Sequence, residues 1–193
     1  ENITQNIFIT GNTGLDNISK EGCEYKNQVL ITMHRRDNHY NMDKWFEELE
    51  KIANKYSDIE FMIPLHPNSN VQKHKHIFKK VKVVEPMNHH DLIEYVKKCK
   101  FVISDSGGLQ EECSYLNKKI IVCRKTTERP ESIGTHSFMC SKPRSLFDLV
   151  DEINENYEVN AECPYGDGKS WDKIINFTNT FFTELQRNTY KLF

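Results

Sequence analysis

The chain has 193 residues, which is enough for one compact domain with a substantial core. Its 26 basic and 28 acidic residues give a net charge of -2, which gives no reason to expect nucleic acid or an anionic membrane as a partner. No apolar run approaches the roughly 20 residues of a membrane span, and the first residues lack the pattern of a signal peptide. We therefore expect a cytoplasmic protein that binds neither nucleic acid nor membrane.

Six cysteines are scattered along the chain without a Cys-x-x-Cys pair. A disulfide framework is not expected in a chain of this length with a normal core, and a zinc site lacks the required ligand spacing. We expect reduced thiols and no structural metal.

The elements follow one another in a regular pattern. The opening ENITQNIFITGN is strand-like, and a helix is expected at residues 12–18. Apolar, β-branched runs predict strands at residues 28–33, 59–65, 80–85, 101–104 and 119–123. Apolar side chains at spacings of three and four predict helices at residues 41–56, 90–99 and 109–117. Residues 170–193 form an amphipathic pattern so rich in aromatic residues that this last helix needs a partner surface.

The alternation of strands and helices predicts an α/β fold, a three-layer Rossmann-like domain with a mostly parallel sheet. The near-continuous apolar strands fit a sheet that is covered on both faces. In such open sheets, ligands bind outside the carboxyl ends of the strands. The loops that follow the strands are therefore the place to look for a site.

The loop DSGGLQEE, at residues 105–112, follows one predicted strand. Its two glycines let backbone N–H groups approach a ligand, Ser106 adds a donor, and the helix start carries partial positive charge. This combination indicates a binding site for a diphosphate, although such turns are common and the motif alone is a weak signal. The two glutamates that follow fit the helix dipole, and a functional one must face hydroxyl groups, such as those of a ribose, rather than phosphate.

Two more strand-end loops carry dense polar chemistry. HRRDN begins with His34, which can act as an acid or base near neutral pH, although a lone histidine is more often structural. RKTTERPE contains Arg129, suited to bidentate phosphate contact, but it also fits a solvated charged loop. His66 and His136 fall in these loops too, whereas the histidines at positions 74, 76, 89 and 90 are expected to be solvated.

Together these motifs resemble, in order and spacing, the nonhydrolysing UDP-N-acetylglucosamine 2-epimerases. The motifs are TMHRRDN, PLHPNSNV, SDSGGLQEE, RKTTERPE and CPYGDGKS. The resemblance spans nearly the whole chain and matches the family's C-terminal half. It implies the C-terminal domain of a two-domain glycosyltransferase-B-type fold. Residues 1–20 would be an interdomain junction, residues 21–168 a UDP-binding domain, and residues 169–193 a helix packing toward a missing N-terminal domain.

That family interconverts UDP-GlcNAc and UDP-ManNAc by eliminating UDP and adding it back, as a step toward polysaccharides. The resemblance therefore implies UDP and UDP-N-acetylhexosamine as ligands, no metal, no cofactor, and a homodimer when the protein is full length. The family's catalytic carboxylates come from the other domain. We expect this chain alone to bind UDP weakly and to be inactive as an enzyme.

Specific residues take roles from the same resemblance. His34 matches the catalytic histidine, and Glu112 matches the acid on the ribose. A second, allosteric substrate site is expected at His66 and Arg35. The sequence departs from the family's motifs nearby, with Asp37 in place of the usual glutamate and with a different residue order in HPNSN. The expected UDP-binding residues are Ser106, Gly107, Gly108, Glu112, Thr127 and Arg129.

Three alternatives stay open. The chain could be the donor-binding domain of a glycosyltransferase, against which HRRDN and TTERPE argue. It could be a stand-alone nucleotide-sugar-binding module, against which the opening's similarity to an interdomain joint argues. It could also be part of a hydrolysing epimerase that releases ManNAc, which would share most of these motifs.

Overall fold

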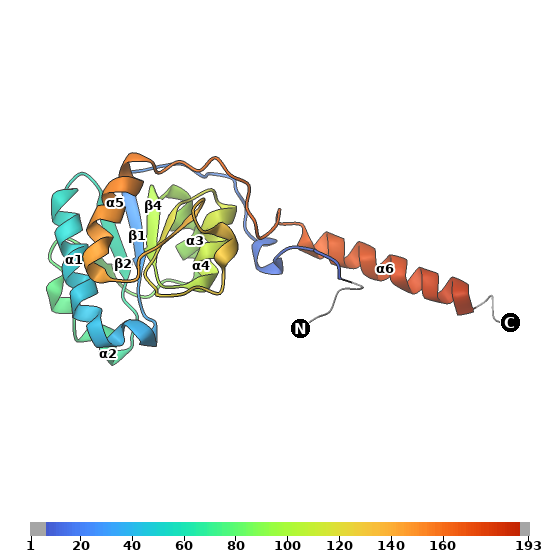
Figure 1. Ribbon diagram of the computed structural model, residues 1–193, viewed down its shortest axis with the longest axis horizontal. Coiled ribbons are helices and arrows are strands. Elements are labelled where there is room, and N and C mark those ends of the chain that lie inside the picture. Colours follow the sequence, from blue (N-terminus) through green and yellow to red (C-terminus); the bar gives the residue numbers. More distant parts are fainter. Residues whose placement is uncertain (1–6, 190–193) are drawn as a thin grey trace. The chain divides into compact units, whose positions relative to one another are not determined.

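The computed structural model describes residues 7–189 of the chain (Figure 1). Two compact units make up the chain. Residues 20–164 form one unit, and the other combines residues up to 19 with residues from 165 onward. We describe each unit by itself.

A sheet of six parallel strands forms the centre of the larger unit, in the order β3-β2-β1-β4-β5-β6. The strands are β1 (Gln28–Thr32), β2 (Glu60–Pro64), β3 (Lys82–Val84), β4 (Phe101–Ser104), β5 (Ile120–Val122) and β6 (Ser137–Met139). The strand order reverses between β1 and β4, the arrangement of doubly wound nucleotide-binding folds. The predicted α/β fold with a parallel sheet is confirmed.

Helices cover both faces of this sheet. They are α1 (Met42–Lys55), α2 (Ser69–Gln72), α3 (His89–Lys98), α4 (Gly107–Tyr115) and α5 (Leu146–Glu155), with short 3-10 turns η2 (Arg36–Asn41), η3 (Lys75–Ile77), η4 (Pro130–Ser132) and η5 (Pro143–Ser145). Figure 1 shows α1 and α5 side by side on one face and α3 and α4 on the other. The predicted three layers are present.

The core explains why these segments fold as they do. Trp45, Leu49 and Ile52 recur at helical spacing on α1, and all three are buried against the sheet, as their periodicity predicts. Among the helices and strands of this unit, β6, α2 and α5 have no counterpart among the predictions. Val150 and Ile153 of α5 pack into the same core as α1.

All six cysteines are free thiols, and four of them are buried. Burial raises the pKa of the Cys99 thiol to about 12, so it is protonated at neutral pH. These buried thiols act as small apolar side chains of the core.

The smaller unit contains η1 (Thr13–Leu15) and the long helix α6 (Ser170–Thr189). The strand-like prediction for the opening is wrong for residues 7–12, which are irregular, while residues 1–6 lie outside the described part. The helix predicted at residues 12–18 is only the turn η1. The predicted final helix is present as α6, and its last expected residues, 190–193, also lie outside the description.

Asp16 fixes the start of α6. Its carboxylate accepts hydrogen bonds from the backbone N–H groups of Ser170 at 3.1 Å and Trp171 at 2.6 Å. A negative charge here also complements the positive end of the helix dipole. Beyond this cap, α6 carries exposed aromatic side chains, among them Phe181 and Phe182 at 49% and 58% exposure.

Gly166 and Gly11 bring the two segments of the smaller unit into backbone contact. Gly166 has a φ of +123°, and a Cβ built on it would lie 3.1 Å from Gly11 Cα. We expect Gly166→Ala to destabilise this contact by about 1–3 kcal/mol, because it adds both backbone strain and a clash. Hydrogen exchange at the Asn12 amide, which donates to the Tyr165 carbonyl at 2.8 Å, should then accelerate.

Gly22→Ala is the matched control for this substitution. Gly22 has a φ of +76°, but a Cβ there would meet no atom within 4 Å. Unchanged exchange at Asn12 in Gly166→Ala would contradict the expected effect.

Candidate functional site

The loops after β1, β2, β3 and β4 enclose a cavity of about 290 Å³ at the carboxyl ends of the strands. Five predicted site residues line it: His34, His66, Ser106, Gly108 and Glu112. Pro86 and Met87, from the loop after β3, complete an apolar wall that the sequence predictions did not include. The cavity lies at the strand ends nearest the reversal between β1 and β4, where ligands of this fold class bind.

Asp105, which directly follows β4, is a fully buried carboxylate. Its Oδ2 accepts hydrogen bonds from the backbone N–H groups of His34 at 3.0 Å and Arg35 at 2.9 Å, and from Asn38 Nδ2 at 3.1 Å. Asn38 also donates to the Cys123 carbonyl at 3.0 Å, which connects the loop after β1 to the end of β5. Asp105 thus fixes the HRRDN loop to β4, a role that the sequence did not reveal.

The turn between β4 and α4 is fixed by hydroxyl groups. Ser104 Oγ accepts a hydrogen bond from the Ser106 N–H at 2.9 Å and lies 2.6 Å from Thr32 Oγ1 of β1. Ser106 is the N-cap of α4 and accepts from the Leu109 N–H at 3.5 Å. Gly107 then begins the helix. The first backbone N–H groups of α4 thereby face the carboxyl edge of the sheet.

His34 and His66 lie face to face in the cavity. Their ring centroids are 5.2 Å apart with an angle of 14° between the planes. His34 Nδ1 lies 3.6 Å from Asp105 Oδ1, and the His34 side chain is 41% exposed. The His34 ring is thus accessible to solvent, and one buried carboxylate, that of Asp105, contacts both the backbone N–H and the ring of this residue.

Glu112 lies deeper in the same cavity, with its side chain only 16% exposed. Its Oε1 is 2.6 Å from His89 Nε2, at the start of α3. The His89 side chain is 64% exposed, as the prediction of a solvated histidine requires, and its ring in addition contacts Glu112, which the sequence did not predict.

The RKTTERPE loop packs along α4. Thr127 Oγ1 donates to Gln110 Oε1 at 2.9 Å, and Arg129 Nε donates to Glu111 Oε1 at 2.7 Å. Glu111, one of the two acids beside the predicted anion seat, therefore neutralises part of the Arg129 charge.

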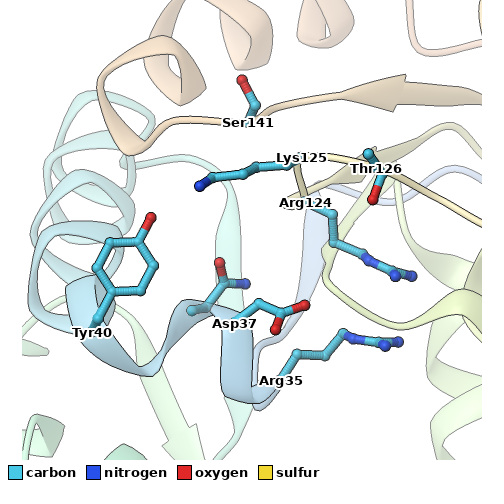
Figure 2. Close-up of a pocket in the computed structure, with 8 residues that line it drawn as sticks. Arg35, Asp37, Tyr40, Arg124, Lys125, Thr126 and Ser141 are labelled. Atoms are coloured by element: carbon cyan, nitrogen blue, oxygen red, sulfur yellow. The ribbon is translucent and has the colours of Figure 1, made fainter.

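Arg35 belongs to a second cavity, of about 350 Å³. Its lining residues are Arg35, Asp37, Asn38, Tyr40, Arg124, Lys125, Thr126 and Ser141. Figure 2 shows the side chains of Arg35 and Arg124 extending in the same direction from two different loops. His66 lines the first cavity and Arg35 the second, and the allosteric role of this pair stays a prediction.

His136 does not belong to the site, and its grouping with the strand-end loops is wrong. It precedes β6, and its carbonyl accepts from the Ile120 N–H at the start of β5. Its side chain is fully buried at the amino end of the strands, and burial lowers its pKa. Protonation of the His136 ring would therefore affect the stability of the fold and not the cavity.

In the part of the chain that the structure describes, no group of three or more His, Cys, Asp or Glu side chains could hold a metal ion. Among the helices described, none is long and apolar enough to cross a membrane.

Comparison with known proteins gives consistent matches. A family model described as UDP-N-acetylglucosamine 2-epimerase matches residues 1–179. The UDP-N-acetylglucosamine 2-epimerase of Bacillus subtilis is 30% identical over 192 residues, covering 88% of this chain and 50% of the relative.

Solved structures match the fold as well. The UDP-GlcNAc 2-epimerase from Neisseria meningitidis, bound to UDP-GlcNAc, gives a TM-score of 0.71 at 34% identity and covers 79% of this chain and 44% of that one. The Methanocaldococcus jannaschii UDP-GlcNAc 2-epimerase, in complex with UDP-GlcNAc and UDP, gives 0.72 at 25% identity, covering 90% of this chain and 54% of that one.

The chain spans about half the length of the curated relatives it matches. The resemblance drawn from the strand-end motifs is confirmed by a family model that covers most of the sequence. This chain belongs to the UDP-N-acetylglucosamine 2-epimerase family.

Proposed function

We propose that this chain is the UDP-binding C-terminal half of an enzyme that interconverts UDP-GlcNAc and UDP-ManNAc. The observation that carries this proposal is the 290 Å³ cavity, in which the start of α4, Glu112 and His34 meet at the strand ends. Relatives that share the fold are bound to UDP-GlcNAc or UDP.

The cavity offers complementary groups for each part of UDP. The backbone N–H groups at the start of α4 and the Ser106 hydroxyl suit the diphosphate. Glu112 suits the ribose, because a carboxylate accepts hydrogen bonds from hydroxyl groups. Pro86 and Met87 supply an apolar wall for the uracil ring. Arg129, beside α4, adds positive charge for the diphosphate.

His34 is the proposed acid–base group of this half. Its solvent-accessible ring lies in the cavity, and Asp105 Oδ1 lies near Nδ1, which favours a proton on that nitrogen and leaves Nε2 to accept or donate one. Elimination of UDP leaves negative charge on the departing diphosphate, which the helix start would stabilise. The opposite wall of the sugar site belongs to the other half of the protein.

The test is a calorimetric titration of the 193-residue chain with UDP, beside a Glu112→Ala variant. We expect the parent chain to bind UDP weakly and the variant to bind it about tenfold more weakly, which corresponds to about 1.4 kcal/mol. The loss should be smaller for inorganic pyrophosphate, which has no ribose.

Glu155→Ala on α5 is the matched control, because it removes an exposed glutamate from the other face of the sheet. Equal affinities of the parent and Glu112→Ala for UDP would place the ribose elsewhere. A parent chain that binds no UDP would contradict the proposal that this half binds the nucleotide by itself.

A further inference from the structure

Glu128 is surrounded by three arginines next to the start of α4. Its Oε2 lies 2.7 Å from Arg124 Nη1. Its Oε1 lies 3.3 Å from Arg129 Nη1 and 3.8 Å from Arg35 Nη1. We call Arg35, Arg124 and Arg129 the arginine cluster. Because these residues come from the loops after β1 and β5, one carboxylate joins two walls of the strand-end region.

The same carboxylate covers the glycine at the helix start. A Cβ built on Gly107 would lie 3.0 Å from Glu128 Oε1 and 3.7 Å from Arg129 Cδ. Glycine at this position lets a phosphate oxygen come close to the backbone N–H groups. Glu128 therefore places a negative charge on the path that a phosphate would take.

The position of Glu128 allows it to move aside. Its side chain is 45% exposed, and ion pairs that solvent reaches are individually weak. Its own backbone N–H and the Arg124 guanidinium hold the pKa of Glu128 below its ordinary value, so the group is ionised at neutral pH. An incoming anion must therefore compete with a carboxylate for the arginine cluster.

We propose that Glu128 is a specificity-determining residue that makes this seat select a nucleoside diphosphate over a monophosphate. The inference rests on the proposed function. A diphosphate has two phosphate groups, so it can contact the start of α4 and the arginine cluster together and displace the carboxylate. A monophosphate carries less negative charge and makes fewer contacts with the arginines and the helix start. These contacts therefore compensate less of the repulsion by Glu128 than the contacts of a diphosphate do.

The test compares the affinities of UDP and UMP for the parent chain and for Glu128→Gln, which removes the charge and keeps the size. We expect the affinity for UMP to rise about tenfold and that for UDP about threefold or less, so that the preference for UDP shrinks. Glu128→Asp keeps the charge and should keep the preference. Glu131→Gln, an exposed acid on the same loop, controls for a general change of charge.

Each outcome has a distinct meaning. If UDP binds the parent and the UDP-to-UMP ratio is the same in Glu128→Gln, this inference is wrong and the proposed function stands. If UDP does not bind the parent, both fall. Thermal unfolding of every variant checks the fold, and Glu128→Ala provides a second neutral variant if Glu128→Gln does not fold.

Discussion

Replacing Asp105 by alanine should lower the free energy of unfolding by about 3–5 kcal/mol. The carboxylate is fully buried and accepts hydrogen bonds from the backbone of His34 and Arg35 and from the Asn38 side chain. Without it, these donors lose their acceptor where water reaches them poorly, and each such loss costs about 1–3 kcal/mol. Urea denaturation of the purified chain measures the change directly.

Two companion variants make this result specific. Asp105→Asn keeps the volume but turns an N–H group toward N–H donors, so it should also destabilise the chain. Asp37→Ala removes an exposed acid from the same loop and should change the free energy of unfolding by no more than about 0.5 kcal/mol. A loss below about 1 kcal/mol in Asp105→Ala would show that the loop reorganises around other acceptors.

Asp105 also illustrates what the sequence could not reveal. The letters DSGG marked the loop as a ligand seat, but the three donors of Asp105 lie 67 to 71 residues earlier in the chain. Local spacing carries no information about such a contact. The same holds for His89, whose partner Glu112 is 23 residues away and on another helix. Residues that act through distant partners become visible only once the sheet is assembled.

The fold was more predictable, for a physical reason. The helix α1 and the strands β1, β2 and β4 have buried side chains at helical spacing or in continuous apolar runs, and a sequence shows both patterns directly. Apart from α5, the misses were short or terminal. β6 has three residues at the sheet edge, too few to give a period, and the opening strand had no sheet to join. The helix α5 is different, because Leu146, Val150 and Ile153 do have helical spacing and could have been found.

The strand-end site was predictable in its parts and not in its contacts. Glycine, serine and glutamate after β4 have intrinsic chemistry that points to phosphate and hydroxyl groups. The pairing of Arg129 with Glu111 depends on how one loop folds along α4, which sequence patterns do not determine. For this reason the motifs indicate the kind of ligand better than they indicate which charged side chains are paired with one another.

We expect no detectable epimerisation of UDP-GlcNAc by the 193-residue chain. Its rate should be at least about 10⁴-fold below that of a complete enzyme. Inversion at C2 removes a proton from one face of the sugar and returns one to the other, which calls for groups on both sides. Among the described residues lining the 290 Å³ cavity, Glu112 is the single carboxylate, and we assign it to the ribose.

Proton NMR in deuterium oxide tests this expectation at the reacting carbon. Incubation of the chain with UDP-GlcNAc should give neither UDP-ManNAc nor deuterium at C2. The full-length Bacillus subtilis relative, run in parallel, is the positive control, and the UDP titration of the same sample shows whether ligand is bound.

The two signals separate the parts of the reaction. Deuterium at C2 without UDP-ManNAc, lost in His34→Gln, would show that this half contains a working base and lacks only the group on the opposite face. Appearance of UDP-ManNAc would show that one half, or two copies of it, encloses the sugar completely. Absence of both signals while UDP binds supports a division of labour, in which this half holds the leaving group and the other half supplies the remaining acid–base chemistry.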